Sequence, residues 1–121
     1  MAQRILIVDD DKGVREFLAE LFLQQKWQVN TAEDGKQGIQ QASEIDYDII
    51  LMDLIMPRVN GLEAIREIIK LKPDSKIIVI TGSQYKNMIS QAISSGAKLF
   101  VKKPFSAEKM LTAVKSLHKE S

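Results

Sequence analysis

The chain of 121 residues is long enough for one domain with one core and too short for two ordinary domains. Hydrophobic residues make up 45% and charged residues 27%, and the net charge of +1 favours neither nucleic acid nor an anionic membrane as a partner. Cysteine is absent, which excludes disulfides and thiolate metal sites, and no apolar run approaches the roughly 20 residues of a membrane span.

The first predicted element is an apolar run at residues 5–8, which leads directly into three aspartates. Similar runs occupy 49–52 and 77–80, and none of the three alternates with polar residues. A strand that is apolar on both faces belongs in the middle of a parallel sheet covered on both sides. The runs at 27–32 and 98–102 mix polar and apolar residues, as edge strands do. We therefore predict five strands, with the second and fifth at the edges.

Helical patterns separate these strands. In four segments apolar residues recur on one helix face at i, i+3 and i+4 spacing, and a fifth segment is more polar. Asp11, Asn60 and Ser106 are suitable helix N-caps, and Gly96 suits a helix end. The expected helical segments are 14–22, 36–44, 62–69, 88–93 and 110–117.

Five strand–helix units predict an α/β fold with a flavodoxin-like (βα)5 doubly wound parallel sheet, as a single domain over residues 1–121. The strand order 2-1-3-4-5 keeps three sequential pairs adjacent and the apolar strands central. This strand order is already known for flavodoxin-like folds. What this sequence itself indicates is which two strands lie at the edges of the sheet. Because the last helix runs to the C-terminus, we expect no effector domain. Ligands of such sheets bind at the carboxyl ends of the strands where the order reverses, here between strands 1 and 3.

Polar side chains follow four neighbouring strand ends. Asp9 and Asp10 follow the first strand, Asp53 the third, Thr81 the fourth and Lys103 the fifth. Carboxylates about 5 Å apart repel by roughly 3 kcal/mol at an effective dielectric near 20, and a divalent cation removes that repulsion. Oxygen ligands without Cys or a well-placed His favour Mg²⁺. A cation, a lysine and a nucleophilic carboxylate together can form an aspartyl phosphate.

Four motifs resemble the response-regulator receiver domain of two-component signalling, in its chemotaxis-regulator-like form. They are "VDD" (8–10), "DLIMPRVNG" (53–61), "TG" (81–82) and "KPF" (103–105), in the family's order and spacing. The resemblance covers essentially the whole chain. It implies a phosphorylation-activated receiver of a phosphorelay, a signalling protein that contributes to its own phosphorylation and dephosphorylation but is not an enzyme in the usual sense.

The resemblance implies a role for each acidic residue. Asp53 accepts the phosphoryl group, Asp10 binds Mg²⁺ directly, and Asp9 helps mainly through water. Asp53 and the backbone carbonyl of Ile55 complete the metal ligands.

The resemblance also implies the roles around the phosphoryl group. Thr81 bonds a phosphoryl oxygen, and Lys103 pairs with the carboxylate or the phosphate. Phe100 is the switch aromatic, which rotates inward when Thr81 is drawn to the phosphate and so changes the surface of helix 4, strand 5 and helix 5. The peptide bond between Lys103 and Pro104 is expected to be cis.

The implied donor is the phosphohistidine of a sensor histidine kinase or a histidine phosphotransfer protein. The downstream partner is a protein that the sequence does not specify, and we expect no direct contact with nucleic acid or a membrane. The protein is expected to be a monomer or a phosphorylation-dependent dimer, and in the cytoplasm because no signal-peptide pattern opens the chain.

Three positions depart from the family's pattern. Asn60 replaces a frequent Asp, which preserves the helix cap. Phe100 replaces a frequent Tyr, so the inward state lacks a hydroxyl hydrogen bond. Ile55, two residues after the acceptor, cannot orient an attacking water with its side chain. We therefore expect a longer phosphoryl lifetime than in relatives with an amide or acid there.

Two other functions fit parts of the sequence. "DDDKG" resembles the opening motif of haloacid-dehalogenase-like phosphatases, with Asp9 as nucleophile and Asp11 as acid/base, although the later acidic motif is missing and Asp53 stays unexplained. A flavodoxin-like frame also suits FMN, but the acidic loop after the first strand repels the phosphate that flavodoxins bind there.

Overall fold

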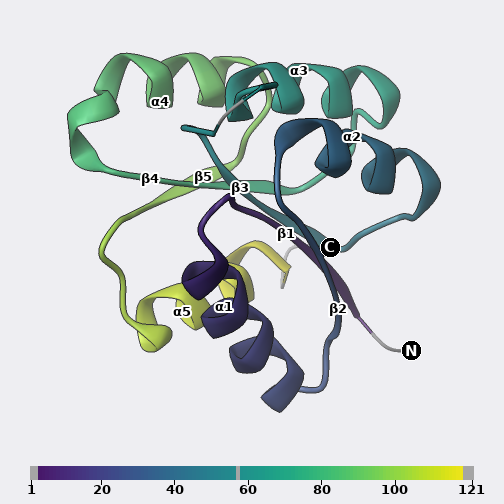
Figure 1. Cartoon of the computed structure of the whole chain (residues 1–121), viewed down its shortest axis with the longest axis vertical. Coiled ribbons are helices and arrows are strands. Elements are labelled where there is room, and N and C mark those ends of the chain that lie inside the picture. The colour runs from purple at the N-terminus through teal and green to yellow at the C-terminus, as the bar shows by residue number, and fades with distance from the viewer. Residues whose placement is uncertain (1–2, 57, 119–121) are drawn as a thin grey trace.

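A five-stranded parallel sheet forms the centre of the computed structural model, which describes residues 3–56 and 58–118 (Figure 1). The spatial order is β2-β1-β3-β4-β5, so the predicted order and the predicted edges are confirmed. All neighbouring strands run parallel. The strands are β1 (Arg4–Val8), β2 (Gln28–Ala32), β3 (Ile49–Asp53), β4 (Ile77–Thr81) and β5 (Leu99–Lys102).

Helices cover both faces of the sheet. They are α1 (Lys12–Gln24), α2 (Gly35–Glu44), α3 (Gly61–Leu71), α4 (Lys86–Ser94) and α5 (Ala107–His118). Figure 1 shows α2, α3 and α4 on one face and α1 with α5 on the other. A short 3₁₀ turn, η1 (Ser83–Tyr85), precedes α4 and is too short for the sequence periodicity to predict. None of the helices within the described ranges combines the length and the apolar character that crossing a bilayer requires.

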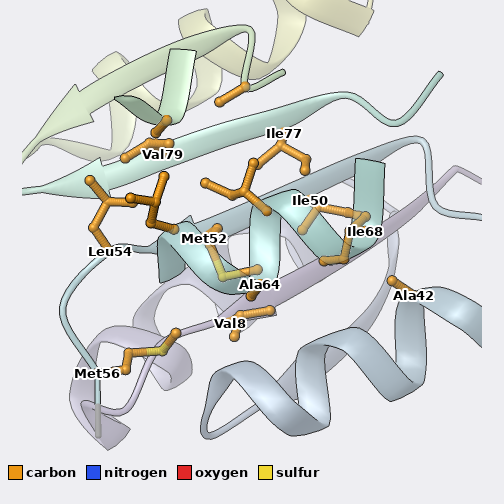
Figure 2. Packing of buried hydrophobic residues seen from close by; sticks show 14 of the residues in the cluster. Val8, Ala42, Ile50, Met52, Leu54, Met56, Ala64, Ile68, Ile77 and Val79 are labelled. Carbon is orange, nitrogen blue, oxygen red and sulfur yellow. The ribbon is translucent and has the colours of Figure 1, made fainter. Parts of the chain in front are cut away.

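The core consists of two apolar clusters, one on each face of the sheet. Leu6 and Val8 of β1 pack on the side of α2 and α3, whereas Ile5 and Ile7 pack on the side of α1 and α5. The alternation follows from the two-residue period of a strand, and β3 and β4 share it. Burying one such side chain fully contributes roughly 1.5–3 kcal/mol. Figure 2 labels members of the first cluster, among them Val8, Ile50, Met52, Ile68 and Val79.

Polar side chains start the helices close to the carboxyl edge of the sheet. Asp11, Asn60 and Ser106 each accept a hydrogen bond from the backbone N–H three residues later, so the predicted caps of α1, α3 and α5 are confirmed. Asp34 caps α2 in the same way, at 2.9 Å from the nitrogen of Gln37. Each cap contributes typically about 1 kcal/mol. The caps therefore fix where α1, α2, α3 and α5 begin at the edge that carries the predicted site.

One predicted helix face is less buried than its spacing indicates. Phe17 lies on the apolar stripe of α1, yet 47% of its surface is exposed, whereas Leu18 and Phe22 are fully buried. The Phe17 ring instead lies 6.2 Å from the ring of Phe105 in the loop between β5 and α5. Since Phe17 belongs to the first two turns of α1, it packs against this loop at the carboxyl edge and not against the sheet.

Candidate functional site at the carboxyl edge of the sheet

Three carboxylates meet at the reversal between β1 and β3. The register pairs Val8 with Met52, so Asp9 and Asp53 leave neighbouring strands at the same level. Carboxylate oxygens of Asp9, Asp10 and Asp53 lie within 4.8 Å of one another. Asp9 is fully buried and Asp53 is 4% exposed, whereas Asp10 is exposed to solvent. The cluster therefore has two buried members and one member that faces solution.

A lysine compensates part of this negative charge. The Nζ atom of Lys103 lies 3.0 Å from Oδ2 of Asp9 and 3.5 Å from Oδ2 of Asp53. The backbone nitrogen of Lys103 donates to the carbonyl of Thr81 at 2.9 Å, which continues the pairing of β5 with β4 up to the site. The Lys103–Pro104 peptide bond is cis, the isomer that the family resemblance implies.

The acid–base properties of this cluster follow from its burial. Burial raises the pKa of Asp53 to about 7, and the neighbouring Asp9 charge adds to the rise, while Lys103 opposes it. Burial alone lowers the pKa of Lys103, but the charges of Asp53 and Asp9 outweigh it and leave this pKa above its ordinary value. Without a further cation, Asp53 therefore holds its proton well above the pH at which an exposed aspartate loses it.

Thr81 contributes a buried hydroxyl at the end of β4. Its side chain is 1% exposed, and its Oγ1 atom forms no hydrogen bond with any residue in the described part of the chain. A buried hydroxyl without a partner costs free energy unless a ligand satisfies it. Thr81 therefore offers a donor to an oxygen-rich group beside Asp53.

The loop after β3 approaches Asp53 closely. The backbone nitrogen of Ile55 donates to Oδ1 of Asp53 at 3.3 Å, while the Ile55 side chain is 40% exposed. Gly61 begins α3 directly against this loop, and a Cβ atom there would lie 2.1 Å from the carbonyl oxygen of Asp53. This close contact requires glycine, and it holds the backbone of Asp53 against the start of α3.

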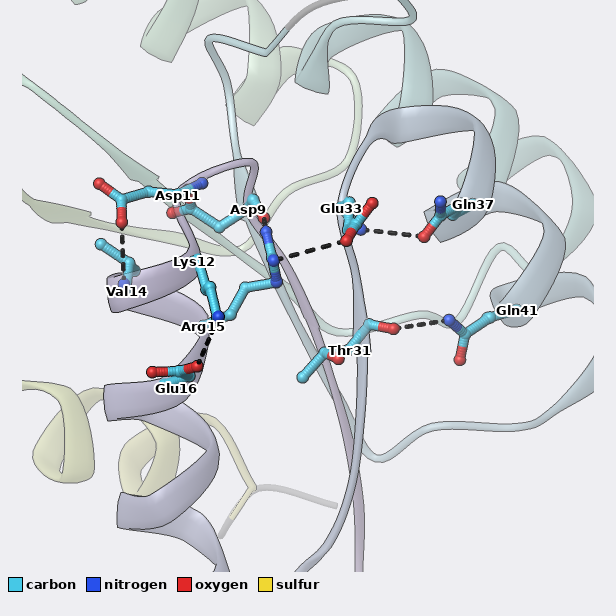
Figure 3. Close-up of polar contacts among 10 residues, drawn as sticks. All are labelled: Asp9, Asp11, Lys12, Val14, Arg15, Glu16, Thr31, Glu33, Gln37 and Gln41. Atoms are coloured by element: carbon cyan, nitrogen blue, oxygen red, sulfur yellow. Dashed lines mark hydrogen bonds and ion pairs between the residues drawn. The ribbon is translucent and has the colours of Figure 1, made fainter.

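Arg15 is a supporting residue that the sequence analysis missed. Its Nη1 atom donates to the backbone carbonyl of Asp9 at 2.8 Å, and its Nη2 atom lies 3.6 Å from Oε1 of Glu33. Figure 3 shows Arg15 reaching from α1 toward Asp9 and Glu33. The backbone nitrogen of Asp11 donates to Oδ1 of Asp9 at 2.9 Å. No sequence signal marks Arg15, because a single arginine on a helix is typical of a solvated surface.

A cavity of about 660 Å³ opens beside Asp53. Asp53, Thr81 and Lys103 line it together with groups that the sequence analysis did not assign to the site. Those groups are Phe17, Gln84, Tyr85 and Phe105. Phe100 lies elsewhere: it is 43% exposed and lines a separate cavity of about 760 Å³ between β5 and α5.

Comparisons with known proteins show which family the chain resembles along its length. The family model of the response regulator receiver domain matches residues 5–115. The chemotaxis protein CheY of Thermotoga maritima is 36% identical over 120 residues, which cover 98% of this chain and 100% of that protein. This match shows that the similarity extends over the whole length of that relative.

Solved structures show the same fold. The crystal structure of a CheY-like receiver domain protein from Methanospirillum hungatei superposes with a TM-score of 0.95 at 25% identity, over 99% of this chain and 96% of that one. The receiver domain of the sensor histidine kinase PA1611 from Pseudomonas aeruginosa superposes with a TM-score of 0.90 at 24% identity, over 98% and 99% of the two chains. That structure has a magnesium ion coordinated in its active-site cleft. The match of residues 5–115 and the similarity to CheY show that the chain belongs to the response-regulator receiver domains of two-component signalling, and its fold and acidic cluster are consistent with this.

Proposed function

We propose that this receiver accepts a phosphoryl group on Asp53 from the phosphohistidine of a sensor histidine kinase or a histidine phosphotransfer protein. The observation that carries the proposal is the environment of Asp53. Its carboxylate lies in a cavity beside the Lys103 ammonium and the Thr81 hydroxyl, which lacks a partner within the described ranges. Together these groups provide a nucleophile, a cation and a hydrogen-bond donor.

The transfer step uses these groups in turn. A carboxylate oxygen of Asp53 forms a bond to phosphorus while the bond from phosphorus to the donor's imidazole nitrogen breaks. The electron pair of that bond returns to the imidazole ring, which takes up a proton. Lys103 balances negative charge on the phosphoryl oxygens, and the Thr81 hydroxyl donates to one of them.

The acidic cluster has the donor set that Mg²⁺ prefers. Asp10, which faces solution, and the carboxylate of Asp53 would hold the ion, together with the backbone carbonyl of Ile55. Asp9 would act mainly through water, because its oxygens already contact Lys103 and the backbone of Asp11. The bound ion would supply positive charge that offsets the repulsion among the carboxylates and on the phosphoryl oxygens.

The proposed output is a change at the surface of α4, β5 and α5. Thr81 ends β4, and β4 pairs with β5 at Val79 and Phe100. When Thr81 moves toward the phosphoryl group, Phe100 would turn from its half-exposed position toward the interior and alter the cavity that it lines with α5. A downstream protein would distinguish the two states at this surface.

Intact-mass measurement after treatment with acetyl phosphate and Mg²⁺ tests the acceptor. We expect one phosphoryl adduct in the wild type and none in Asp53→Asn. Asp74→Asn, which removes an exposed carboxylate remote from the cavity, is the matched control and keeps the adduct. An adduct that survives Asp53→Asn contradicts the proposal.

The same experiment tests the phosphatase alternative, which the comparisons do not support. In that mechanism Asp9 is the nucleophile and Asp11 the acid/base. In the structure, Asp9 is fully buried and paired with Lys103, and Asp11 caps α1. We expect the adduct to form in Asp11→Ala, whereas a phosphatase of that type would lose it.

A further inference from the structure

Gln84 is an uncharged polar residue at the acceptor cavity with no assigned role. It lies in η1, three residues after Thr81, and it lines the same cavity as Asp53 and Lys103. Within the ranges that the structure describes, its carboxamide forms no hydrogen bond with another residue. Gln84 thus brings a free donor and a free acceptor to the edge of the site.

Gly82, two residues before Gln84, leaves the space in which this carboxamide lies. A Cβ atom on Gly82 would lie 2.4 Å from Oε1, 3.0 Å from Cδ and 3.2 Å from Nε2 of Gln84. The side chain of Gln84 is therefore folded back over the backbone of Gly82, which directly follows Thr81. Because Gly82 has no side chain, the carboxamide can lie beside the cavity that both residues line.

The chemistry of the site needs such a group. Hydrolysis of an aspartyl phosphate requires a water molecule held in line with the bond that breaks, and a glutamine carboxamide can hold one. The Ile55 side chain, which lines the same cavity, has no polar atom for this purpose. Lys103 is engaged with Asp9 and Asp53. Gln84 reaches the cavity from a different loop, the one that follows β4.

We propose that Gln84 positions the water that hydrolyses the phosphoryl group on Asp53; this inference rests on the proposed acceptor function. The oxygen of the water forms a bond to phosphorus, and the bond from phosphorus to the Asp53 oxygen breaks. Its electron pair restores the Asp53 carboxylate, and both protons of the water end on the inorganic phosphate that leaves. The Gln84 carboxamide accepts a hydrogen bond from the water and orients its oxygen.

The experiment follows the loss of the adduct by intact mass after the protein has been phosphorylated with acetyl phosphate and the donor has been removed, with Mg²⁺ present. Gln84→Ala removes the carboxamide, and Gln84→Leu removes its polarity but keeps its bulk. We expect both variants to retain the adduct roughly tenfold longer than the wild type. Gln91→Ala, an exposed glutamine on α4 that does not line the cavity, is the matched control with an unchanged lifetime.

Gly82→Ala provides an independent test on a different residue. Gly82 has a φ of −75°, which alanine adopts without strain, so the added methyl group acts by displacing the carboxamide. We expect this variant to lengthen the lifetime as Gln84→Ala does. In all variants the rate of adduct formation should stay within about twofold of the wild-type rate, since a water-positioning group acts only on hydrolysis. The melting temperature should stay within about 2 °C of the wild-type value.

Two results would overturn the inference. If Gln84→Ala shortens the lifetime while Gln84→Leu leaves it unchanged, the side chain shields the phosphoryl group and does not orient water. If neither variant changes the lifetime, Gln84 has no role in hydrolysis. In both cases the adduct still forms on Asp53, so the acceptor function stands. Failure of the wild type to form any adduct overturns the acceptor function and this inference together.

Discussion

The ammonium nitrogen of Lys103 lies 3.5 Å from Oδ2 of Asp53, and the same nitrogen pairs with the fully buried Asp9 at 3.0 Å. Replacing Lys103 by Met would leave the Asp9 carboxylate buried without its cation. Breaking a buried pair in this way costs several kcal/mol in a closed site, and we expect roughly 2–3 kcal/mol here because Lys103 is partly exposed. Urea unfolding at pH 7 without Mg²⁺ measures this loss.

The same substitution also tests the proposed role of Lys103 in phosphoryl transfer. We expect Lys103→Met to reduce the rate of phosphorylation by acetyl phosphate about 100-fold, since a fixed cation at the developing charge is lost. The neighbouring exposed Lys102, replaced in the same way, should leave the rate within twofold of the wild type. Equal rates for Lys102→Met and Lys103→Met would show that the charge is not needed at this position.

The pKa of Asp53 makes stability depend on pH. Since its pKa rises from 3.8 to about 7 on folding, the folded state holds a proton between these values that the unfolded state has released. The stability that this group contributes is complete below pH 4 and falls as the pH rises toward 7. Asp53→Asn cannot lose a proton, so its free energy of unfolding should exceed that of the wild type increasingly over this range.

We expect the free energy of unfolding of Asp53→Asn to exceed that of the wild type by roughly 2 kcal/mol at pH 7. This is about half of the free energy to which the full shift in pKa corresponds, because the cavity is open to solvent. Urea unfolding from pH 4 to pH 8 with EDTA present measures it. A variant that is less stable than the wild type at pH 7 would mean that the Asp53 carboxylate stabilises the metal-free fold.

With Mg²⁺ present, the wild type should become more stable than Asp53→Asn. An ion that binds only the folded protein stabilises it by about 2.7 kcal/mol at a concentration one hundred times the dissociation constant. We expect thermal melts to show a large increase for the wild type and for Asp74→Asn, and a small one for Asp10→Ala and Asp53→Asn. Equal increases in all four proteins would place the ion outside the acidic cluster.

A substitution at Gly61 tests how the backbone of Asp53 is held in place. A methyl group there would lie 2.1 Å from the carbonyl oxygen of Asp53, so the loop or α3 has to move. We expect Gly61→Ala to lower the free energy of unfolding by roughly 2–4 kcal/mol. In Gly13→Ala the nearest atom to the new methyl group is a side-chain oxygen at 3.2 Å, and helix propensity favours alanine at this position in α1. This control should be neutral or slightly stabilising, and a neutral Gly61→Ala would show that the close contact is not needed.

Much of the fold could be predicted because the strong patterns in the sequence are local. The uninterrupted apolar runs identify β1, β3 and β4, and their burial on both faces confirms the prediction. The mixed runs identify β2 and β5 as edges. Asp9, Asp10 and Asp53 could be brought together from sequence because the carboxyl ends of parallel strands meet at one edge.

The remaining features depend on contacts between segments that are distant in sequence. The pattern of α1 alone does not distinguish Arg15 from other surface residues of the helix. Its contacts with Glu33 and with the carbonyl of Asp9 form only when α1 packs beside β2. Phe17 fits the spacing of a buried stripe, but Phe105 of a later loop decides where its ring packs. Gln84 comes to line the cavity beside Asp53 only through η1, and the three residues of η1 leave no periodic pattern.

The central claim is that the carboxylate of Asp53 accepts the phosphoryl group while its neighbours hold the charge. The most direct test is a crystal structure of the protein soaked with Mg²⁺ and beryllofluoride, a mimic of the phosphoryl group. We predict beryllium bonded to an Asp53 oxygen, a fluorine within hydrogen-bond distance of the Thr81 hydroxyl, and Mg²⁺ beside Asp10. An unmodified Asp53 carboxylate beside an empty acidic cluster would contradict the claim.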